Sequence, residues 1–381
     1  MLHRYLHTHF LLKLRNEIKE VYLNRIIYTF ALSLINIFVP IYLIKIGYSV
    51  NAAILYLVYV FLFMAIVMPF TAFLDHRLGT KHTLWLSLPF LLVYLFLLHT
   101  IKIYSWPLIL IGFFLGTSHA LYWISLNSDF AQYSNKFKVG AETSYLFALP
   151  ALAAIAAPFL GGLILSKTSM NFLIGIVFVL LTISFLPLLL TKDYKATLTY
   201  SWKKIFGKRN FDMLFPFIAL GILHVSGWIF LLFVFFMVET YIKIGFVATL
   251  GAAGAAIFML FVGKISDKVS KKILMKIGGI LNCLLFLSLL LIRTQLQVFI
   301  IAGIMGFVII LIDLPLFVLA CERAKKENPT EFMVFREFGL HIGRFALLLP
   351  LFLFPLMIKF RFAFLLAALA SLYFLFARIK E

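Results

Sequence analysis

Long apolar runs recur along the whole chain, and they constrain its fold more than any other feature. Each run covers about 18–25 residues, the length that an α-helix needs to cross roughly 30 Å of hydrocarbon. Twelve such runs are present, at residues 22–44, 52–74, 82–100, 106–127, 144–165, 171–190, 213–238, 245–265, 272–292, 297–320, 336–357 and 360–378. Because the runs lack the alternation of a membrane β-strand, the sequence predicts an all-α polytopic membrane protein with twelve transmembrane helices.

The composition and the distribution of charge agree with this prediction. Of the 381 residues, 64% are hydrophobic and 13% are charged, which excludes an ordinary soluble domain. The net charge of +19 is unevenly distributed, since only seven of the 34 Lys and Arg fall in the connections expected outside: Lys45, Lys102, Lys167, Lys243, Arg293, Lys359 and Arg361. This asymmetry predicts cytoplasmic N- and C-termini in the plasma (inner) membrane. The basic excess is therefore attributed to topology and to contact with membrane lipid, and no nucleic acid partner is expected.

Two short polar segments occupy equivalent places in the two halves of the chain. Segment 71–81 follows the second apolar run, and segment 263–272 follows the eighth. Three residues of the first align with three of the second at a constant offset of 191 residues: Arg77, Gly79 and Lys81 with Lys268, Ser270 and Lys272. In membrane proteins, internal duplication is typical of transporters that work by alternating access.

A polar, basic stretch at the midpoint separates six apolar runs from six others. The sequence predicts a cytoplasmic N-terminal segment at 1–20, an N-terminal six-helix bundle at 21–190, a cytoplasmic central loop at 191–212 and a C-terminal six-helix bundle at 213–381. The two bundles are expected to be pseudo-symmetric.

This layout resembles the major facilitator superfamily over essentially the whole chain, with no assignable subfamily. Members carry the loop motif Gly-x-x-x-Asp-Arg-x-Gly-Arg-Arg between helices 2 and 3 and a weaker copy between helices 8 and 9. Here the second copy is the better match: Gly263, Asp267, Lys268, Lys271 and Lys272 fit the pattern. In the first copy Arg77, Gly79 and Lys81 fit, whereas Asp75 stands one residue early.

The resemblance implies a secondary active transporter of a small molecule that needs no cofactor. The chain contains no Gly-x-x-x-x-Gly-Lys-Ser/Thr loop for direct use of ATP. It also shows no acid–base or metal-ligand cluster of the kind that an intramembrane enzyme needs. A transporter is therefore expected rather than an enzyme, without a metal site, and as a monomer. A non-transport or lipid-handling protein on the same fold, such as a scaffold, receptor or flippase, remains the alternative.

Acidic residues that could pair with the two loops lie at similar spacing in each half. Asp129 follows Asp75 by 54 residues, and Glu322 follows Asp267 by 55. Both are expected where helices 4 and 10 reach the inner surface, and such pairs would form when an inner gate is shut. The alternative is that these charges only mark topology.

Residues 153–162 of the fifth run are similar to a motif of proton-coupled drug exporters in the same superfamily. That motif is Gly-x-x-x-Gly-Pro-x-x-Gly-Gly, and here two of its glycines are alanine. Close packing of helices through small residues explains the segment equally well.

Polar residues inside the hydrocarbon are costly, so they are the site candidates. The superfamily resemblance places helices 1, 4, 7 and 10 around a central cavity. Asp313 is the only carboxylate well inside a span, and it is predicted to carry a coupling proton, with His224 or His119 as its partner or as a substrate contact. The predicted substrate-binding residues are Asn36, Tyr122, Trp123 and Trp228. A purely structural hydrogen bond from Asp313 is the alternative.

The predicted spans place no positive charge in mid-membrane. Arg25, Arg293 and Arg344 all fall near the ends of the apolar runs. An anion carrier is expected to direct Arg or Lys at its substrate, so a neutral, cationic or apolar compound is favoured. The helix-5 resemblance favours export of that compound.

Overall fold

A computed structural model describes residues 16–133, 139–189, 193, 195, 206–207, 210–266, 269–377 and 379. These residues form helices and connections without a strand. The first half contains α2 (Asn16–Ile35), η1 (Asn36–Phe38), α3 (Val39–Lys45), α4 (Val50–Arg77), α5 (Thr80–Tyr104), α6 (Leu108–Tyr133), α7 (Val139–Ala153), α8 (Ala157–Lys167), α9 (Met170–Phe185) and η2 (Leu186–Leu189). The second half contains α11 (Phe211–Val238), α12 (Tyr241–Ser266), α13 (Lys271–Leu289), α14 (Gln295–Lys326), α15 (Pro329–Leu348), η3 (Leu349–Leu353) and α16 (Leu356–Phe376).

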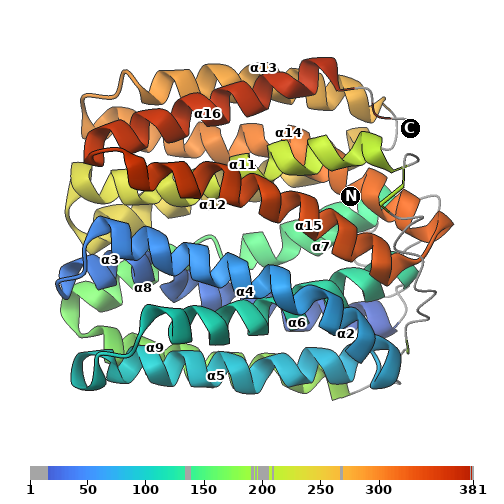
Figure 1. The fold of residues 1–381 in the computed structure, drawn as a ribbon, viewed down its shortest axis with the longest axis horizontal. Coiled ribbons are helices and arrows are strands. Elements are labelled where there is room, and N and C mark those ends of the chain that lie inside the picture. The colour runs from blue at the N-terminus through green and yellow to red at the C-terminus, as the bar shows by residue number, and fades with distance from the viewer. Residues whose placement is uncertain are drawn as a thin grey trace, which may run out of the picture.

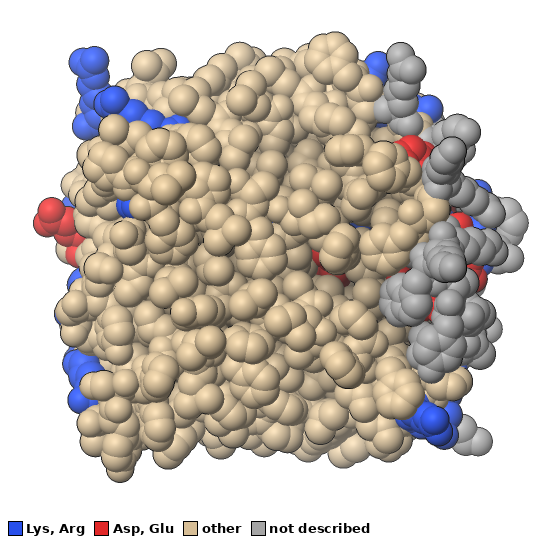
Figure 2. All heavy atoms as spheres, viewed as in Figure 1, with Lys and Arg blue, Asp and Glu red and all other residues tan. Residues whose placement is uncertain are grey.

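The fold class predicted from the sequence is confirmed. Among the described residues, eleven helical segments are long and apolar enough to cross a membrane. The twelfth predicted span corresponds to α15 and η3, and α15 carries Arg336, Glu337 and Arg344 along its length. Figure 2 shows an apolar surface across the middle of the molecule, with Lys and Arg gathered at its two ends. The protein is a multi-pass integral membrane protein.

Proline residues account for the interruptions within two spans. The first span changes from α2 through the η1 turn to α3, which has Pro40 in its first turn. The fifth is divided between α7 and α8, and Pro158 stands at the start of α8. Proline has no N–H to donate to the preceding turn, so each helix is broken just before it.

The helices run side by side along the long axis of Figure 1, with α2–α9 in its lower part and most of α11–α16 above. The chain ends marked N and C lie toward the same end of the molecule, which we call the terminal end. The opposite end, where α3 connects to α4, is called the distal end. An even number of spans places both chain ends on one side of a membrane.

The two halves pack closely against each other toward the terminal end. The ring of Phe317 on α14 lies 5.0 Å from that of Phe147 and 6.3 Å from that of Phe130, measured between centroids. A separate buried cluster joins Val334 of α15 to residues of α4 and α6: Met64, Met68, Ala72, Ala120 and Ile124. Residues 314–321 of α14 are buried throughout. Space between the halves therefore remains on the distal side of these contacts.

Candidate functional site: a cavity between the two halves

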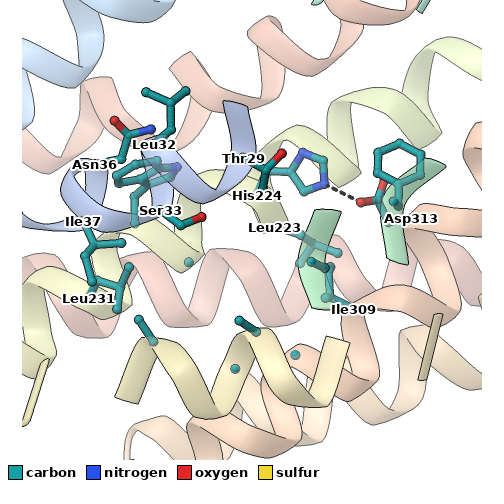
Figure 3. Close-up of a pocket in the computed structure, with 18 of the residues that line it drawn as sticks. Thr29, Leu32, Ser33, Asn36, Ile37, Leu223, His224, Leu231, Ile309 and Asp313 are labelled. Atoms are coloured by element: carbon teal, nitrogen blue, oxygen red, sulfur yellow. Dashed lines mark ion pairs between the residues drawn. The ribbon is translucent and has the colours of Figure 1, made fainter. Parts of the chain in front are cut away.

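A cavity of about 770 Å³ lies between the two halves. Its walls come from the predicted helices 1, 4, 7 and 10, here α2, α6, α11 and α14, and also from α4, α7, α12 and α15. Thr29, Ser33 and Asn36 point into it from the first span, facing Leu223 and Leu231 of α11 (Figure 3). The volume is in the range of small-molecule binding sites.

An ion pair between α11 and α14 lies at one end of this cavity. His224 Nε2 is 3.3 Å from Asp313 Oδ2 (Figure 3). The side chains are 28% and 26% exposed, so both are open to the cavity. Toward the terminal end, α14 is buried directly after Asp313. The pair therefore forms part of the cavity floor, where water or a ligand can reach a group able to exchange a proton.

The second predicted partner of Asp313 occupies another wall. His119 lines the cavity from α6. No hydrogen bond between His119 and Asp313 is found among the described residues. The structure thus brings Asp313 together with His224 rather than with His119.

Two arginines of α15 share one carboxylate at the cavity wall. Arg336 Nη1 donates to Glu337 Oε1, and Arg344 Nη1 lies 3.9 Å from Glu337 Oε2. Arg344 also lies 4.9 Å from the ring centroid of Phe61 on α4. Glu337 therefore has its negative charge balanced by two cations.

A third arginine faces the cavity from α2 without such a partner. Arg25 is 4% exposed, and its Cζ lies 5.0 Å from the ring centroid of Trp123 and 4.3 Å from that of Phe147. Its Nε and Nη1 atoms have no hydrogen-bond partner in the described part of the chain. Aromatic rings therefore lie beside a guanidinium with two buried nitrogens that make no hydrogen bond to the described residues.

Three of the four residues predicted to bind substrate line the cavity, and the fourth does not. Asn36, Trp123 and Trp228 contribute to its walls. Tyr122 instead is fully buried behind Tyr28, on which it stacks with 3.8 Å between ring centroids. The Tyr122 hydroxyl donates to Asn24 Oδ1 at 2.8 Å, so its polar end is already occupied. Of these two stacked tyrosines, Tyr28 is the one that lines the cavity.

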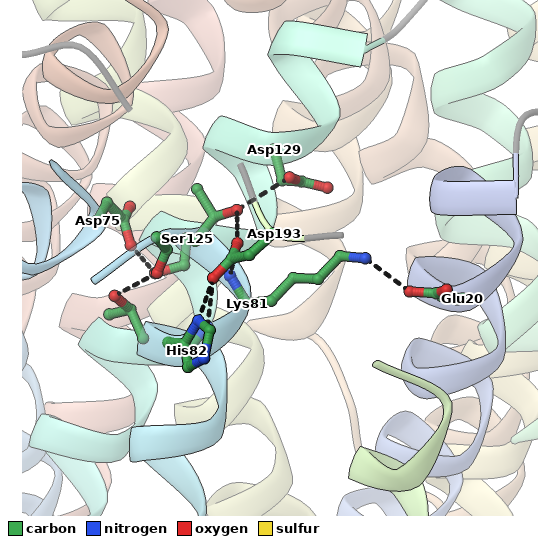
Figure 4. Close-up of polar contacts among 10 residues, drawn as sticks. Glu20, Asp75, Lys81, His82, Ser125, Asp129 and Asp193 are labelled. Carbon is green, nitrogen blue, oxygen red and sulfur yellow. Dashed lines mark hydrogen bonds and ion pairs between the residues drawn. The ribbon is translucent and has the colours of Figure 1, made fainter. Parts of the chain in front are cut away.

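The polar loop of the first half joins helices of that half at the terminal end (Figure 4). Ser125 Oγ donates to Asp75 at 2.6 Å, and Thr80 Oγ1 donates to Asp129 at 3.0 Å. Lys81 Nζ lies 2.8 Å from Glu20 Oε2, with both side chains at most 5% exposed. The displaced Asp75 is therefore a buried contact between α4 and α6.

Gly79 is required by the geometry of the turn before α5. Its φ of 103° is in the left-handed region that side chains rarely adopt. The carboxylate of Asp193 fills the space beside it, accepting from the backbone N–H of Lys81 at 2.9 Å and of His82 at 3.1 Å. Asp193 thereby caps the start of α5. In the same loop, the Arg77 guanidinium lies 5.4 Å from the ring centroid of Phe73.

The second half repeats one contact of the first. Lys271, at the start of α13, lies 3.2 Å from Glu322 of α14, just as Thr80 at the start of α5 contacts Asp129 of α6. Gly263 lies in α12 and Lys272 in α13, whereas Asp267 and Lys268 lie outside the described residues. These loop contacts each join helices of one half, and a gating role for them stays a prediction.

Comparison with known proteins identifies the family. The family model of the Major Facilitator Superfamily matches residues 21–348, which is most of the chain. The chain belongs to the major facilitator superfamily. The predicted family is thus confirmed, although no curated protein sequence matches the chain.

Solved structures of major facilitator transporters share the fold. A bacterial homologue of the iron transporter ferroportin, in its outward-facing state, superposes with a TM-score of 0.73 at 14% identity, covering 96% of this chain and 98% of that one. The major facilitator transporter FucP in the outward conformation gives 0.72 at 15% identity, covering 96% and 99%. A structure of the E. coli fucose:proton symporter FucP gives 0.69 at 16% identity, covering 95% and 97%. This major facilitator fold supports secondary transport by alternating access, and the members compared here are transporters rather than enzymes.

Arg25 and Arg344 lie further inside their helices than the apolar runs indicated, because these two helices begin earlier than the runs do. Helix α15 starts at Pro329 rather than at residue 336, so Arg344 lies about 22 Å inside it. Helix α2 includes residues from Asn16 rather than from 22, which places Arg25 about 14 Å inside. The first turns of both helices contain charged side chains, so their mean hydropathy is low and the apolar runs begin later than the helices do. The sequence signal for an earlier helix start was a charged residue inside the apolar run, close to where that run begins.

Proposed function

We propose that this major facilitator protein is a proton-coupled secondary transporter in which Asp313 carries the coupling proton and His224 is its partner. The observation that carries the proposal is the 3.3 Å contact between His224 Nε2 and Asp313 Oδ2 in the wall of the central cavity. Among the described residues, the carboxylates that line the cavity are Asp313 and Glu337. Since Glu337 already contacts two arginines, Asp313 is the carboxylate better suited to gain and lose a proton.

The proposed mechanism uses the position of the pair at the cavity floor. The bundles at 21–190 and 213–381 rock against each other, and the cavity alternates between the two sides of the membrane. A proton on Asp313 removes the negative charge that faces His224 and so changes how α11 and α14 attract each other. We also propose that the terminal end faces the cytoplasm and that the protein resides in the plasma membrane, in keeping with the distribution of Lys and Arg.

Proteoliposomes loaded with a pH-sensitive dye test the coupling. A panel of organic anions, cations and neutral compounds is applied with and without an imposed pH gradient, and proton movement is recorded together with uptake. We expect gradient-driven accumulation of at least one compound. Flux without dependence on the gradient would indicate facilitated diffusion, and no flux across the panel would favour the non-transport or lipid-handling alternative.

Variants assign the coupling to the pair. Asp313→Asn is expected to lose gradient-driven accumulation but to retain exchange of substrate at equal pH, because exchange needs no net release of a proton. His224→Gln is expected to weaken the pH dependence of transport. Glu239→Gln and His99→Gln alter exposed residues of the same types and serve as matched controls. An Asp313→Asn protein with full gradient-driven transport would contradict the proposal.

A further inference from the structure

The Arg25 guanidinium is a buried charge, and two of its three nitrogens make no hydrogen bond within the part of the chain that the structure describes. Its Cζ lies over the rings of Trp123 and Phe147, while Nε and Nη1 have no partner among the described residues. Arginine stays protonated in proteins, so this site keeps a positive charge. Burying a charge without a partner is costly, and buried polar atoms without hydrogen bonds are rare. A chain that retains such a group in a cavity wall points to an occupant that completes it.

The charged residues of the cavity, taken together, leave one positive charge over. The arginines that line it are Arg25, Arg336 and Arg344, and the carboxylates are Asp313 and Glu337. Glu337 contacts the two arginines of its own helix, and Asp313 contacts His224. With neutral histidines, the cavity therefore has one more positive than negative charge. A single negative charge on a ligand balances it.

A second buried group beside the same wall lacks a partner. The Tyr28 hydroxyl has no hydrogen-bond partner in the described structure, although the side chain is 1% exposed and lines the cavity. Tyr28 follows Arg25 by three residues on α2, so both project from the same face of the helix. A guanidinium and a phenol on one face can donate together to one carboxylate.

The rest of the cavity is suited to an apolar body. Aromatic side chains from both halves contribute to its walls: Phe61, Trp123, Phe147, Trp228, Phe230 and Phe286. A cavity of about 770 Å³ is far larger than a small inorganic anion requires. We infer that the substrate is an amphipathic organic monoanion, whose carboxylate binds Arg25 and Tyr28 and whose apolar part lies against these aromatic walls. This inference deepens the proposed function and rests on it.

Equilibrium binding to the purified full-length protein tests the inference with ligands that differ only in charge. The probes are 2-naphthoate, 2-naphthamide and 2-naphthylmethylammonium, with 3-phenylpropionate, its amide and 3-phenylpropylammonium as a second series. Affinities are measured by calorimetry and by quenching of tryptophan fluorescence, since Trp123 lies next to Arg25. A carboxylate is expected to bind about 10- to 100-fold more tightly than its amide, the range for a charge-assisted hydrogen bond. Equal affinity of acid and amide in both series, or tighter binding of the ammonium ligands, would overturn the inference.

Variants locate the charge preference. Arg25→Gln is expected to lower the affinity for the carboxylate to that for the amide and to leave the affinity for the amide unchanged. Arg293→Gln, at an exposed distal position, is the matched control and is expected to keep the preference. If Arg25→Gln does not fold, Arg25→Met keeps an apolar stem of similar length without the charge, and it is expected to lose the preference. A carboxylate preference that persists in either folded variant would place the anion site elsewhere.

Failure of this inference can be told apart from failure of the proposed function. Binding is measured at one pH without a membrane, so it does not depend on coupling. Gradient-driven flux of a neutral or cationic compound, without a carboxylate preference, would overturn the inference alone. A carboxylate preference that depends on Arg25, with flux unaffected by Asp313→Asn, would overturn the coupling role alone.

Discussion

Two glycines at the contact between α8 and α12 allow the halves to approach each other, and enlarging either one gives a quantitative test of that contact. A Cβ placed on Gly162 would lie closer than 3.0 Å to the carbonyl oxygen of Tyr241, and one on Gly245 would lie equally close to that of Pro158. Ordinary contacts begin at 3.4 Å. Alanine at Gly162 therefore requires the two helices to separate by at least about 0.4 Å, because both neighbouring atoms belong to backbone.

The expected cost of Gly162→Ala is about 1–3 kcal/mol, the usual penalty for overpacking a tight contact. Alanine gains up to about 1 kcal/mol of helix propensity over glycine, which hides part of this cost. Gly175→Ala in α9 measures the gain in helix propensity alone, since no atom lies within 4 Å of the added Cβ. Relative to Gly175→Ala, the Gly162→Ala protein should unfold at a lower temperature in detergent.

Because Gly162 contacts the other half, its enlargement should also alter access to the cavity. A single cysteine at Ser33, in a background without Cys283 and Cys321, reports that access through its rate of labelling by a maleimide. Separation of α8 from α12 near the distal end is expected to increase labelling from that side. The same exchange at Gly161, whose Cβ would meet the Leu34 carbonyl of its own half, should lower stability without this increase.

The double variant at Gly162 and Gly245 tests the reasoning most directly. Once one alanine has separated the helices, the second has less left to displace, so the cost of the double variant should be smaller than the sum of the two single costs. If Gly162→Ala equals Gly175→Ala in both stability and labelling, the close approach of these helices is refuted. Strictly additive costs would show that the two glycines act at independent contacts.

Two further predictions concern the terminal end. Lys81→Met removes the cation beside the buried Glu20 carboxylate and should cost about 3–5 kcal/mol, measured by unfolding in detergent, with partial recovery on adding Glu20→Gln and little effect of Lys102→Met at an exposed position. Gly79→Ala combines an unfavourable φ of 103° with a collision against Asp193, and it should cost at least about 1–3 kcal/mol in the same assay. In a background that already carries Asp193→Ala, Gly79→Ala should cost less by the part due to the collision, and no remaining cost there would contradict the strained backbone.

The apolar runs predicted the number, order and approximate limits of the helices. The seventh run, 213–238, corresponds closely to Phe211–Val238 because its ends coincide with the ends of the apolar segment. The tenth, 297–320, falls short of Gln295–Lys326 because the last turns of that helix contain charged residues. Hydropathy reports burial in hydrocarbon, whereas a helix continues for as long as its backbone hydrogen bonds do. Because of errors of this kind, the sequence predicted Arg25 and Arg344 near the ends of their spans, whereas the structure places both in the cavity wall.

The candidate site was predictable where a polar residue stood alone in an apolar run. Asp313 and His224 stand out in this way, and the structure brings them within 3.3 Å. The choice between Tyr28 and Tyr122 was not predictable, because two stacked tyrosines have similar surroundings in sequence and only packing decides which one faces the cavity. The role of Asp193 as a cap for α5 was also out of reach, since it joins residues more than 100 positions apart.

The two proposals together give a physical reason for coupling a proton to an anion. With neutral histidines, the empty cavity has an excess of one positive charge, contributed by residues of both halves. A bound monoanion alone removes that excess, and a proton taken up by Asp313 restores it. The empty protein and the fully loaded protein then carry the same net charge in the cavity, whereas the protein loaded with anion alone does not. Charge enclosed in a medium of low dielectric strongly affects the free energy of closure. If closure is most favourable at one net charge, the protein changes access between the two sides of the membrane when it is empty or fully loaded. It changes access less readily when only the anion or only the proton is bound.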